Sequence, residues 1–432
     1  MMKVLVISGL PWRNDNSFGN TYSNWFSQME NVEIAHICLA DGLPTEVNNV
    51  SAYFQVSEKA LTKSLFKFNS KKNSVGVVIR PSVTEEIKCD NSDKSFYSRL
   101  LNIGKKYHPP ILYLIKECIW KFGNINYDDM FSFIKSFQPD IIFMSLSYAC
   151  FLDRVALKIF SVFKLPIVLE ASIDVYTLKQ FSVFPTYWIK RFWVRYKSRQ
   201  ICKVASLLYV ISEKQRLDYS KIFNLPIKVM YKFADTKRHL VDYNRSEGRL
   251  RYLYTGNLGL GRRETLSWLA NALKNSGNGY LDIYTPTALT DSQKESLTHQ
   301  GICTIFPPIT SQQVIEEQNK SDILVHVESF SLKNKLEVRY SVSTKIMDYI
   351  STGRCILAIG PSNIASMEYL KNNGLALIAN SKDEINNKIN EINSNLEIVD
   401  KLANNNISFA IETLDEKSQR LEFLNDLHNS IK

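Results

Sequence analysis

Short runs of apolar residues recur along this chain, and between them lie longer stretches in which apolar residues return every three or four positions. The short runs are typical of strands buried on both faces, and the longer stretches are typical of helices with one apolar face. Their alternation predicts an α/β fold of parallel sheets covered by helices. In the first half the predicted strands are Lys3–Ser8, Glu33–Cys38, Ile141–Ser145, Ile167–Glu170, Leu207–Ile211 and Ile227–Met230.

The segments between these strands predict loops and helices. Gly9–Gly19 is expected to be a loop that leads into a helix at Asn20–Met29. Two more helices are predicted at Ser57–Phe66 and Ser92–Lys106. The polar, lysine-rich stretch Lys67–Asn73 between them is expected to be a loop.

The second half alternates more regularly. Predicted strands are Leu250–Tyr254, Tyr280–Tyr284, Cys303–Phe306, Ile323–Val327, Cys355–Ile359 and Ala376–Ile378. Predicted helices are Arg263–Asn275, Asp291–Gln300, Ser311–Asn319, Ser343–Ser351, Asn363–Asn372 and Asp383–Asn393. In doubly wound sheets ligands bind at the carboxyl ends of the strands, where the strand order reverses. The turns after Tyr254, Val327 and Ile359 are therefore expected to share one edge.

Length predicts two domains, because 432 residues are many for one core and domains of about 200 residues are common. The polar stretch 236–249 lacks clear periodicity and is the expected linker. We therefore expect a Rossmann-like domain at 1–235 and a second one at 250–410. Residues 411–432 are expected to form a C-terminal helix that can pack back on the first domain.

Composition narrows the cellular setting. The 7 cysteines are scattered and form no C-x-x-C, which speaks against a disulfide framework or a zinc site and favours a reducing cytosol. No run of about 18 apolar residues free of charge occurs, so no transmembrane helix is expected. The first apolar run is also too short for the core of a signal peptide. The protein is expected in the cytoplasm.

The most informative motif begins at the first strand of the second half. Tyr254-Thr-Gly-Asn-Leu-Gly-Leu-Gly-Arg-Arg263 predicts a strand, a glycine-rich turn and a helix opened by two arginines. Glycines let the backbone approach an anion, helix amides donate to it, and arginine supplies bidentate positive charge. The turn therefore predicts a diphosphate pocket. Its residues are Gly256, Asn257, Gly259, Gly261, Arg262 and Arg263.

Two later segments add polar groups at the same edge. Glu328 directly follows the strand Ile323–Val327, and the helix Ser343–Ser351 carries Lys345 in its first turn. Lys345 lies where it can reach a phosphate, and the amides of Ser343 and Thr344 can cap the same anion. Together with the glycine turn, these residues predict a site for a nucleotide sugar.

These motifs resemble glycosyltransferases of the GT-B fold, and most closely the bacterial members of glycosyltransferase family 4 that assemble capsule or O-antigen polysaccharide. The resemblance is most specific between Leu250 and Leu370. It implies two Rossmann-like domains facing across a cleft, a nucleotide-sugar donor on the second, an acceptor on the first, and retention of anomeric configuration. It implies neither cofactor nor metal, and the sequence contains no D-x-D triplet.

The same resemblance assigns roles to particular residues. Glu328 aligns with the first acid of the family's paired-glutamate motif, which contacts the transferred sugar. Asp348 aligns with the second acid, which binds the ribose, although here it is aspartate and the charged insert Ser331–Tyr340 stretches the spacing. In the first domain, Glu170 stands near the family's catalytic histidine and Asp174 takes the place of its trailing acid. A carboxylate at a strand end can orient an acceptor hydroxyl or support the transition state.

Further features of the first half bear on the acceptor and the membrane. Phe18-Gly-Asn-Thr-Tyr-Ser-Asn-Trp-Phe26 also looks like a segment of polysaccharide transferases, which places Gly19 and Asn20 on an acceptor-side loop. Val175–Ala205 interleaves aromatic residues with seven cations and contains no acidic residue. This mixture favours peripheral contact with an anionic inner membrane, where a polyprenyl-diphosphate-linked or other saccharide acceptor would be met. The alternatives are an ordinary solvated helix or, less favoured, a nucleic-acid surface.

Three classes of function remain open at this point. The first is a retaining glycosyltransferase that acts in surface-polysaccharide synthesis. The second is a nucleotide-sugar epimerase of the same fold, which would need an acid/base set drawn from Glu170, Asp174 and His326. The third is a non-catalytic partner protein that keeps the fold without its chemistry. Glu170, which stands near the position of the family's catalytic histidine, supports this third hypothesis.

Overall fold

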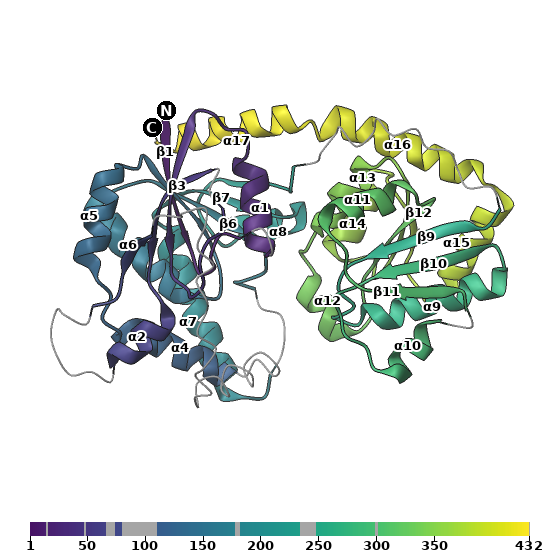
Figure 1. Ribbon diagram of the computed structural model, residues 1–432, viewed down its shortest axis with the longest axis horizontal. Helices are drawn as coiled ribbons and strands as arrows, with labels where there is room; N and C mark the ends of the chain where they lie inside the picture. Colours follow the sequence, from purple (N-terminus) through teal and green to yellow (C-terminus); the bar gives the residue numbers. More distant parts are fainter. Residues whose placement is uncertain are drawn as a thin grey trace. The chain divides into compact units, whose positions relative to one another are not determined.

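The computed structural model describes residues 1–13, 16–46, 49–65, 74–79, 110–177, 182–233, 248–298 and 301–431. The chain divides into two compact units, which are coloured along the sequence in Figure 1. Unit 1 contains Met1–Val210, Gln215–Met230 and Phe423–Lys432, and unit 2 contains Ile211–Lys214 and Tyr231–Glu422. The expected helix at Ser92–Lys106, the loop at Lys67–Asn73 and residues 236–247 of the expected linker lie outside the described residues.

Unit 1 is built on an 8-stranded sheet of order β4-β3-β2-β1-β5-β6-β7-β8. All neighbours pair in parallel except β3 and β4. Because the chain moves outward from β1 through β2 and returns at β5, the strand order reverses between β1 and β5. The strands are β1 (Met2–Ser8), β2 (Val32–Cys38), β3 (Val50–Gln55), β4 (Val77–Ile79), β5 (Ile141–Ser145), β6 (Ile167–Ala171), β7 (Ala205–Val210) and β8 (Ile227–Val229).

Helices cover both faces of this sheet (Figure 1). They are α1 (Ser17–Phe26), α2 (Glu58–Leu65), α4 (Pro110–Phe122), α5 (Tyr127–Phe137), α6 (Cys150–Phe163), α7 (Pro185–Cys202) and α8 (Glu213–Ser220). The end of α17 (Glu416–Ile431) belongs to this unit as well. There Phe423 packs edge-on against Phe26 and Phe143, and Asp426 accepts hydrogen bonds from Tyr209 and Lys228.

The start of α1 corrects one expectation. Gly19 and Asn20 do not lie on a loop, because α1 begins at Ser17 and both residues are in its first turn. The side chain of Asn16 caps the helix by accepting a hydrogen bond from the Gly19 amide at 2.7 Å. A Cβ atom on Gly19 would lie 1.9 Å from the carbonyl oxygen of Arg13. The glycine is therefore required for close backbone packing.

Unit 2 is a 6-stranded, all-parallel sheet of order β11-β10-β9-β12-β13-β14. Its strands are β9 (Leu250–Thr255), β10 (Gly279–Tyr284), β11 (Cys303–Phe306), β12 (Ile323–Val327), β13 (Cys355–Ile359) and β14 (Leu377–Ala379). The helices are α9 (Arg262–Ser276), α10 (Asp291–Thr298), α11 (Ser311–Asn319), α12 (Leu332–Val338), α13 (Thr344–Ser351), α14 (Ala365–Asn372), α15 (Lys382–Ser394) and α16 (Glu397–Thr413). The expected C-terminal helix at 411–432 is thus divided, since α16 extends to Thr413 and α17 starts at Glu416.

Alternate residues of the unit 2 strands point into two different cores, as the period of a strand requires. Tyr252, Tyr254, Val325 and Val327 pack with α9 and α15 on one face. Leu253 and Leu324, which lie between them in sequence, pack with α13, α14 and α16 on the other. The sheet is therefore buried on both sides, which explains why its strands read as nearly continuous apolar runs.

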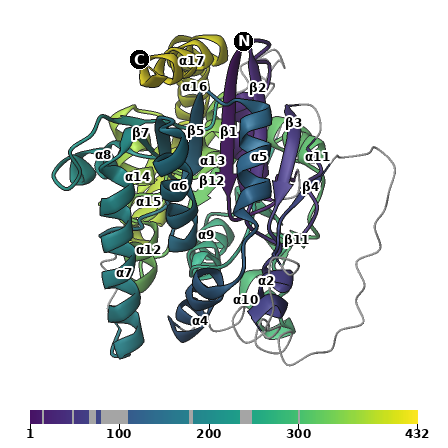
Figure 2. The same cartoon turned by 90° about the vertical axis from the view of Figure 1, so that its left-hand side faces the viewer.

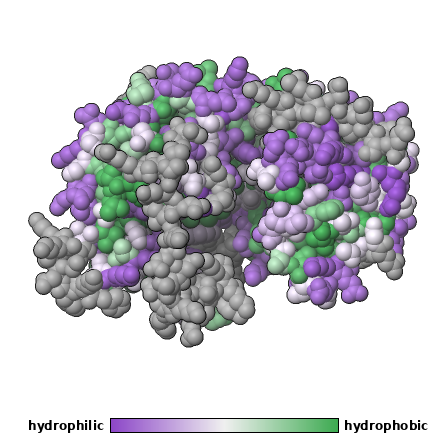
Figure 3. Space-filling model, viewed as in Figure 1, coloured by the Kyte–Doolittle hydropathy of each residue, from purple (hydrophilic) through white to green (hydrophobic). Residues whose placement is uncertain are grey.

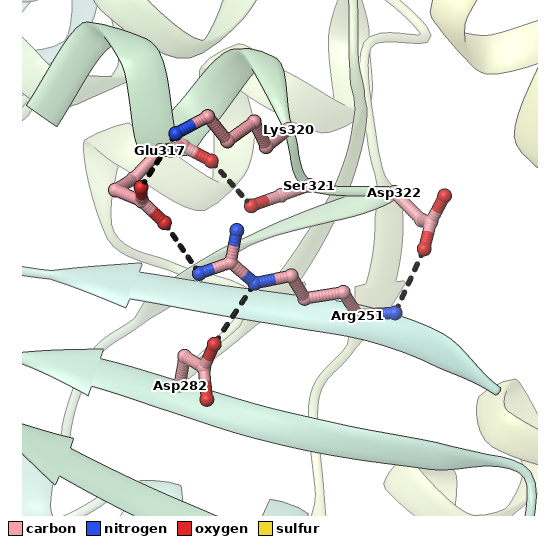
Figure 4. A network of polar contacts seen from close by, with 6 residues as sticks. All are labelled: Arg251, Asp282, Glu317, Lys320, Ser321 and Asp322. Atoms are coloured by element: carbon pink, nitrogen blue, oxygen red, sulfur yellow. Dashed lines mark hydrogen bonds and ion pairs between the residues drawn. The ribbon is translucent and has the colours of Figure 1, made fainter. Parts of the chain in front are cut away.

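A polar network fastens α11 to the amino-terminal end of this sheet (Figure 4). The Arg251 guanidinium donates to Asp282 at 2.8 Å and to Glu317 at 2.6 Å, and the Arg251 amide donates to Asp322 at 2.8 Å. Lys320 and Ser321 complete the set around Glu317. Since the guanidinium is shared by two carboxylates, this buried charge is compensated and holds the helix in register with β9 and β10.

Candidate functional site

The candidate site lies where the strand order of unit 2 reverses. The chain proceeds outward from β9 through β10 to β11 and then returns to the other side of β9 as β12. The loops that follow β9 and β12 consequently leave neighbouring strand ends in opposite directions, and ligands of doubly wound sheets bind at such a point. The glycine turn follows β9 and Glu328 follows β12, so both predicted motifs lie at this point.

The glycine turn has backbone geometry that needs glycine at two positions. Gly256 has φ of 141° and Gly261 has φ of 74°, which are left-handed values that side chains disfavour. A Cβ on Gly261 would come within 2.5 Å of the Ser329 hydroxyl oxygen, and one on Gly256 within 2.7 Å of the Lys345 ammonium nitrogen. Gly261 is the N-cap of α9, so the turn delivers the backbone directly to a helix amino terminus.

Arg262 and Glu328 form the central ion pair. Two hydrogen bonds run from the Arg262 guanidinium to the carboxylate, Nε to Oε2 at 3.1 Å and Nη2 to Oε1 at 2.9 Å. The Glu328 side chain is 4% exposed and that of Arg262 is 19% exposed. Burial alone would lower the pKa of Arg262, but the adjacent Glu328 outweighs it and the pKa is raised. The two predicted residues are thus brought together, and Nη1 takes no part in their pair.

Lys345 reaches the same point from the first turn of α13. Its ammonium group donates to the carbonyl oxygen of Thr255 at 2.9 Å and lies 4.3 Å from the centre of the Tyr254 ring. Burial lowers its pKa to about 7, and the positive charge of Arg262 contributes to the shift. Glu328 and Asp348 oppose that shift without cancelling it. Additional negative charge here would therefore stabilise the protonated amine.

His326 lies beside these two cations. It sits between Val325 and Val327 in β12, so its ring points to the α13 face of the sheet. Its Nε2 is buried and has no hydrogen-bond partner among the described residues. Burial, reinforced by Lys345 and Arg262, lowers its pKa to about 3. The ring is therefore neutral at physiological pH.

The other predicted donor-site residues have contacts of their own. Asn257 Oδ1 accepts the Gly259 amide at 2.6 Å, which shapes the turn, and Arg263 donates to the Ser296 hydroxyl at 2.9 Å. The Asp348 carboxylate accepts a hydrogen bond from the Lys232 ammonium group at 2.8 Å. Ser343 is the N-cap of α13 and its side chain makes no capping bond, while Thr344 begins the helix and is exposed.

In unit 1 the two candidate carboxylates have different surroundings. Glu170 is buried in β6, accepts hydrogen bonds from Ser172 at 2.6 Å and Tyr22 at 3.3 Å, and has a pKa raised by burial. Asp174 is partly buried and accepts from the Thr177 amide at 2.9 Å and from the Tyr219 hydroxyl at 3.1 Å. These contacts hold the loop after β6 together, so Asp174 stabilises that loop in addition to any role in catalysis.

Several site residues were not anticipated from the sequence. Tyr254 lies against Lys345 and donates to the Asn257 carbonyl oxygen at 2.7 Å. The insert after Glu328 forms α12, from which Asn334 donates to the Ser329 hydroxyl at 3.2 Å. The insert thereby closes on Gly261. The only sequence signal for this helix is a short apolar pattern, Leu332, Leu336 and Val338.

Comparisons with known proteins bear on the fold. No family model and no curated protein sequence matches the chain. Among solved structures, a sucrose-phosphate synthase from Thermosynechococcus elongatus matches with a TM-score of 0.59 at 9% identity, over 98% of each chain. WaaG, a glycosyltransferase involved in lipopolysaccharide biosynthesis, matches with 0.58 at 11% identity, over 98% of this chain and 99% of its own. HepE from Anabaena, solved in complex with UDP-glucose, matches with 0.58 at 11% identity, over 99% and 100%.

The chain has the GT-B fold. Its two sheets, parallel except for β4, correspond to the two Rossmann-like domains of these structures over nearly their whole length. The fold class expected from the sequence is therefore confirmed. Within the described part of the chain no cluster of three or more metal-binding side chains occurs, and no helix there is long and apolar enough to cross a membrane.

Proposed function

We propose that the protein is a retaining glycosyltransferase that moves a sugar from a nucleotide-sugar donor held on unit 2. The observation that carries this proposal is the cluster at the strand-order reversal of unit 2, where two cations and a buried carboxylate meet two helix amino termini. Arg262, Lys345 and Glu328 come from three separate elements. A diphosphate joined to a sugar has the charge and the length to span such a cluster.

In this proposal the donor diphosphate lies over the amino ends of α9 and α13. Lys345 and the Nη1 edge of Arg262 neutralise the charge that develops on the leaving diphosphate, in place of a metal ion. Glu328 contacts the transferred sugar. Asp348 releases its hydrogen bond with Lys232 and accepts hydrogen bonds from the ribose hydroxyls instead. The leaving phosphate oxygen takes the proton of the acceptor hydroxyl, so the sugar bond forms on the face from which the diphosphate departs.

We further propose that the acceptor binds to unit 1 and is a growing saccharide, either free or linked to polyprenyl diphosphate. Glu170 and Asp174 are the candidate carboxylates there. The likeness to WaaG, with its role in lipopolysaccharide biosynthesis, supports a role in surface polysaccharide. An enzyme with this task works in the cytoplasm at the inner face of the membrane, and the acid-free helix α7 supports peripheral attachment.

The test is incubation of the intact protein with a panel of nucleotide sugars. We expect one of them to raise the melting temperature, because a ligand that binds the folded state stabilises it. The same compound should release nucleoside diphosphate, slowly with water and faster with a saccharide acceptor. Conversion of the sugar without diphosphate release would instead identify an epimerase. Binding with neither reaction would identify a non-catalytic partner protein.

A further inference from the structure

Helix α7 exposes a continuous line of apolar side chains. The residues of α7 that are buried include Val194, Ser198 and Ile201, which face unit 1. On the outward side the exposed residues recur every three or four positions, which places them along one line of the helix. We define the α7 stripe as these residues and the two that precede the helix, namely Val183, Phe184, Trp188, Ile189, Phe192 and Tyr196.

The exposure of this stripe is unusual for a solvated helix. Phe192 is 71% exposed, Phe184 63% and Ile189 55%. Single exposed apolar residues are common on protein surfaces, whereas a contiguous set marks a contact surface. Figure 3 shows one face of the protein, on which hydrophobic and hydrophilic residues are intermingled.

The cations of α7 flank this stripe and several are turned back toward unit 1. Lys190 lies between the rings of Tyr113 and Tyr148, at 4.8 and 4.7 Å from their centres. Arg191 and Arg195 donate to backbone carbonyl oxygens in the loop before the helix, at 3.0 and 2.9 Å. Toward the helix end Arg199 and Lys203 are exposed. The exposed face of α7 is therefore largely apolar, whereas Lys190, Arg191 and Arg195 contact other parts of unit 1.

We propose that the α7 stripe is the surface by which the protein docks on an anionic lipid bilayer, with the stripe entering the headgroup layer and the flanking cations meeting lipid phosphates. This proposal deepens, and rests on, the proposed function at a membrane-linked acceptor. Aromatic residues settle at the headgroup level, and cations beside them are attracted to anionic lipid. The neighbouring helix α4, which packs beside α7 (Figure 2), also exposes Ile111, Ile115 and Phe122.

Charge favours a bilayer over a second copy of the chain as the occupant. From Ser182 to Ala205 the sequence contains no aspartate or glutamate and six lysines or arginines. Two copies meeting through this helix would place like charges opposite each other, at a cost in binding. Lipid phosphates carry the opposite charge, so a bilayer satisfies both the apolar stripe and its cationic flanks.

The experiment is flotation of the full chain with vesicles of phosphatidylcholine and phosphatidylglycerol. The test variant is Ile189→Ser with Phe192→Ser. Its matched control is Val162→Ser with Leu217→Ser, which removes two apolar side chains of unit 1 that are 52% and 50% exposed. We expect the test variant to lower vesicle partitioning at least about tenfold and the control to leave it unchanged. Arg199→Gln with Lys203→Gln should lower it roughly fivefold per cation, and added salt should lower it for the unaltered chain.

Equal partitioning of the test variant and the control, or no flotation of the unaltered chain, would overturn the proposal. A doubled mass in light scattering without lipid that the test variant abolishes would also overturn it, because the stripe would then be an interface between copies. Thermal shift with nucleotide sugars separates this question from the proposed function. A chain that floats but binds no nucleotide sugar keeps the docking surface and loses the donor site, and the reverse result keeps the donor site alone.

Discussion

Replacing Arg262 with methionine should destabilise unit 2 more than any other single change in the candidate site. The Glu328 side chain is 4% exposed, and both of its carboxylate oxygens accept from this one guanidinium. Removing one partner of a buried ion pair typically costs about 3–5 kcal/mol, because the remaining charge stays buried without compensation. Since the Arg262 side chain is 19% exposed and water can partly replace it, we expect a loss near the lower limit, about 3 kcal/mol.

The converse change, Glu328→Gln, should cost about 1 kcal/mol, since glutamine preserves the volume and one acceptor while Arg262 retains some access to water. The double variant contains no uncompensated buried charge, so its cost should be about 1–2 kcal/mol, well below the sum of the single changes. The coupling energy between the two positions is then about 2–3 kcal/mol.

Equilibrium urea unfolding of the four proteins measures this coupling, and thermal unfolding provides a second reading. For a unit of this size a loss of 3 kcal/mol corresponds to a drop in melting temperature of roughly 6–12 °C. Arg263→Met is the matched control, because the Arg263 guanidinium donates to the uncharged Ser296 hydroxyl and its removal should cost about 1 kcal/mol or less. Additivity of the single losses within about 0.5 kcal/mol would refute the view that Glu328 depends on Arg262.

Three further predictions concern the same cluster. Because the pKa of Lys345 is about 7 and a bound diphosphate favours its charged form, nucleotide-sugar affinity in calorimetry should fall about tenfold from pH 6 to pH 8, and Lys345→Met should remove this dependence. Glu328→Gln should reduce turnover far more than binding of the bare nucleoside diphosphate, and equal losses in both would mark a purely structural carboxylate. In urea unfolding, Gly261→Ala should lower the free energy of unfolding by about 1 kcal/mol or more beyond the loss caused by Gly277→Ala. Both glycines have φ above 70°, but of the two only Gly261 has close neighbours. Equal losses would show that the contact with Ser329 is unimportant.

Most elements of unit 2 could be predicted from the sequence because local pattern determines them. Cys303–Phe306, Ile323–Val327 and Cys355–Ile359 were expected with the bounds they have, since each is a short apolar run between polar or turn-forming residues. The short helix α12 was missed because only Val338 is buried among its residues Leu332–Val338. Its apolar pattern is therefore too short to predict a helix from the sequence alone.

The pairing of site residues could not be predicted in the same way. Arg262 and Glu328 were each expected at the site, but 66 positions separate them and their contact depends on β9 and β12 being neighbours in the sheet. The glycine at position 19 was assigned to an acceptor loop because a resemblance suggested it. Glycine is required there because the Arg13 carbonyl oxygen approaches closely, and no sequence pattern predicts that contact.

The ion pair explains how one cluster can hold both the cations proposed to bind a diphosphate and the carboxylate proposed to contact a sugar. An unpaired carboxylate as buried as Glu328 would be costly, and so would Arg262 and Lys345 side by side without a nearby negative charge. Pairing Glu328 with Arg262 satisfies both residues, and Lys345 adjusts through the lowered pKa that lets it lose its proton. In the proposed function a donor diphosphate contacts the Nη1 edge of Arg262, so it would share this guanidinium with Glu328, and its negative charge would return the proton to Lys345. Binding of the anionic end of the donor would thus weaken the hold of Arg262 on Glu328, the carboxylate proposed to contact the sugar, so that the two parts of the proposed substrate would be recognised in one coupled step.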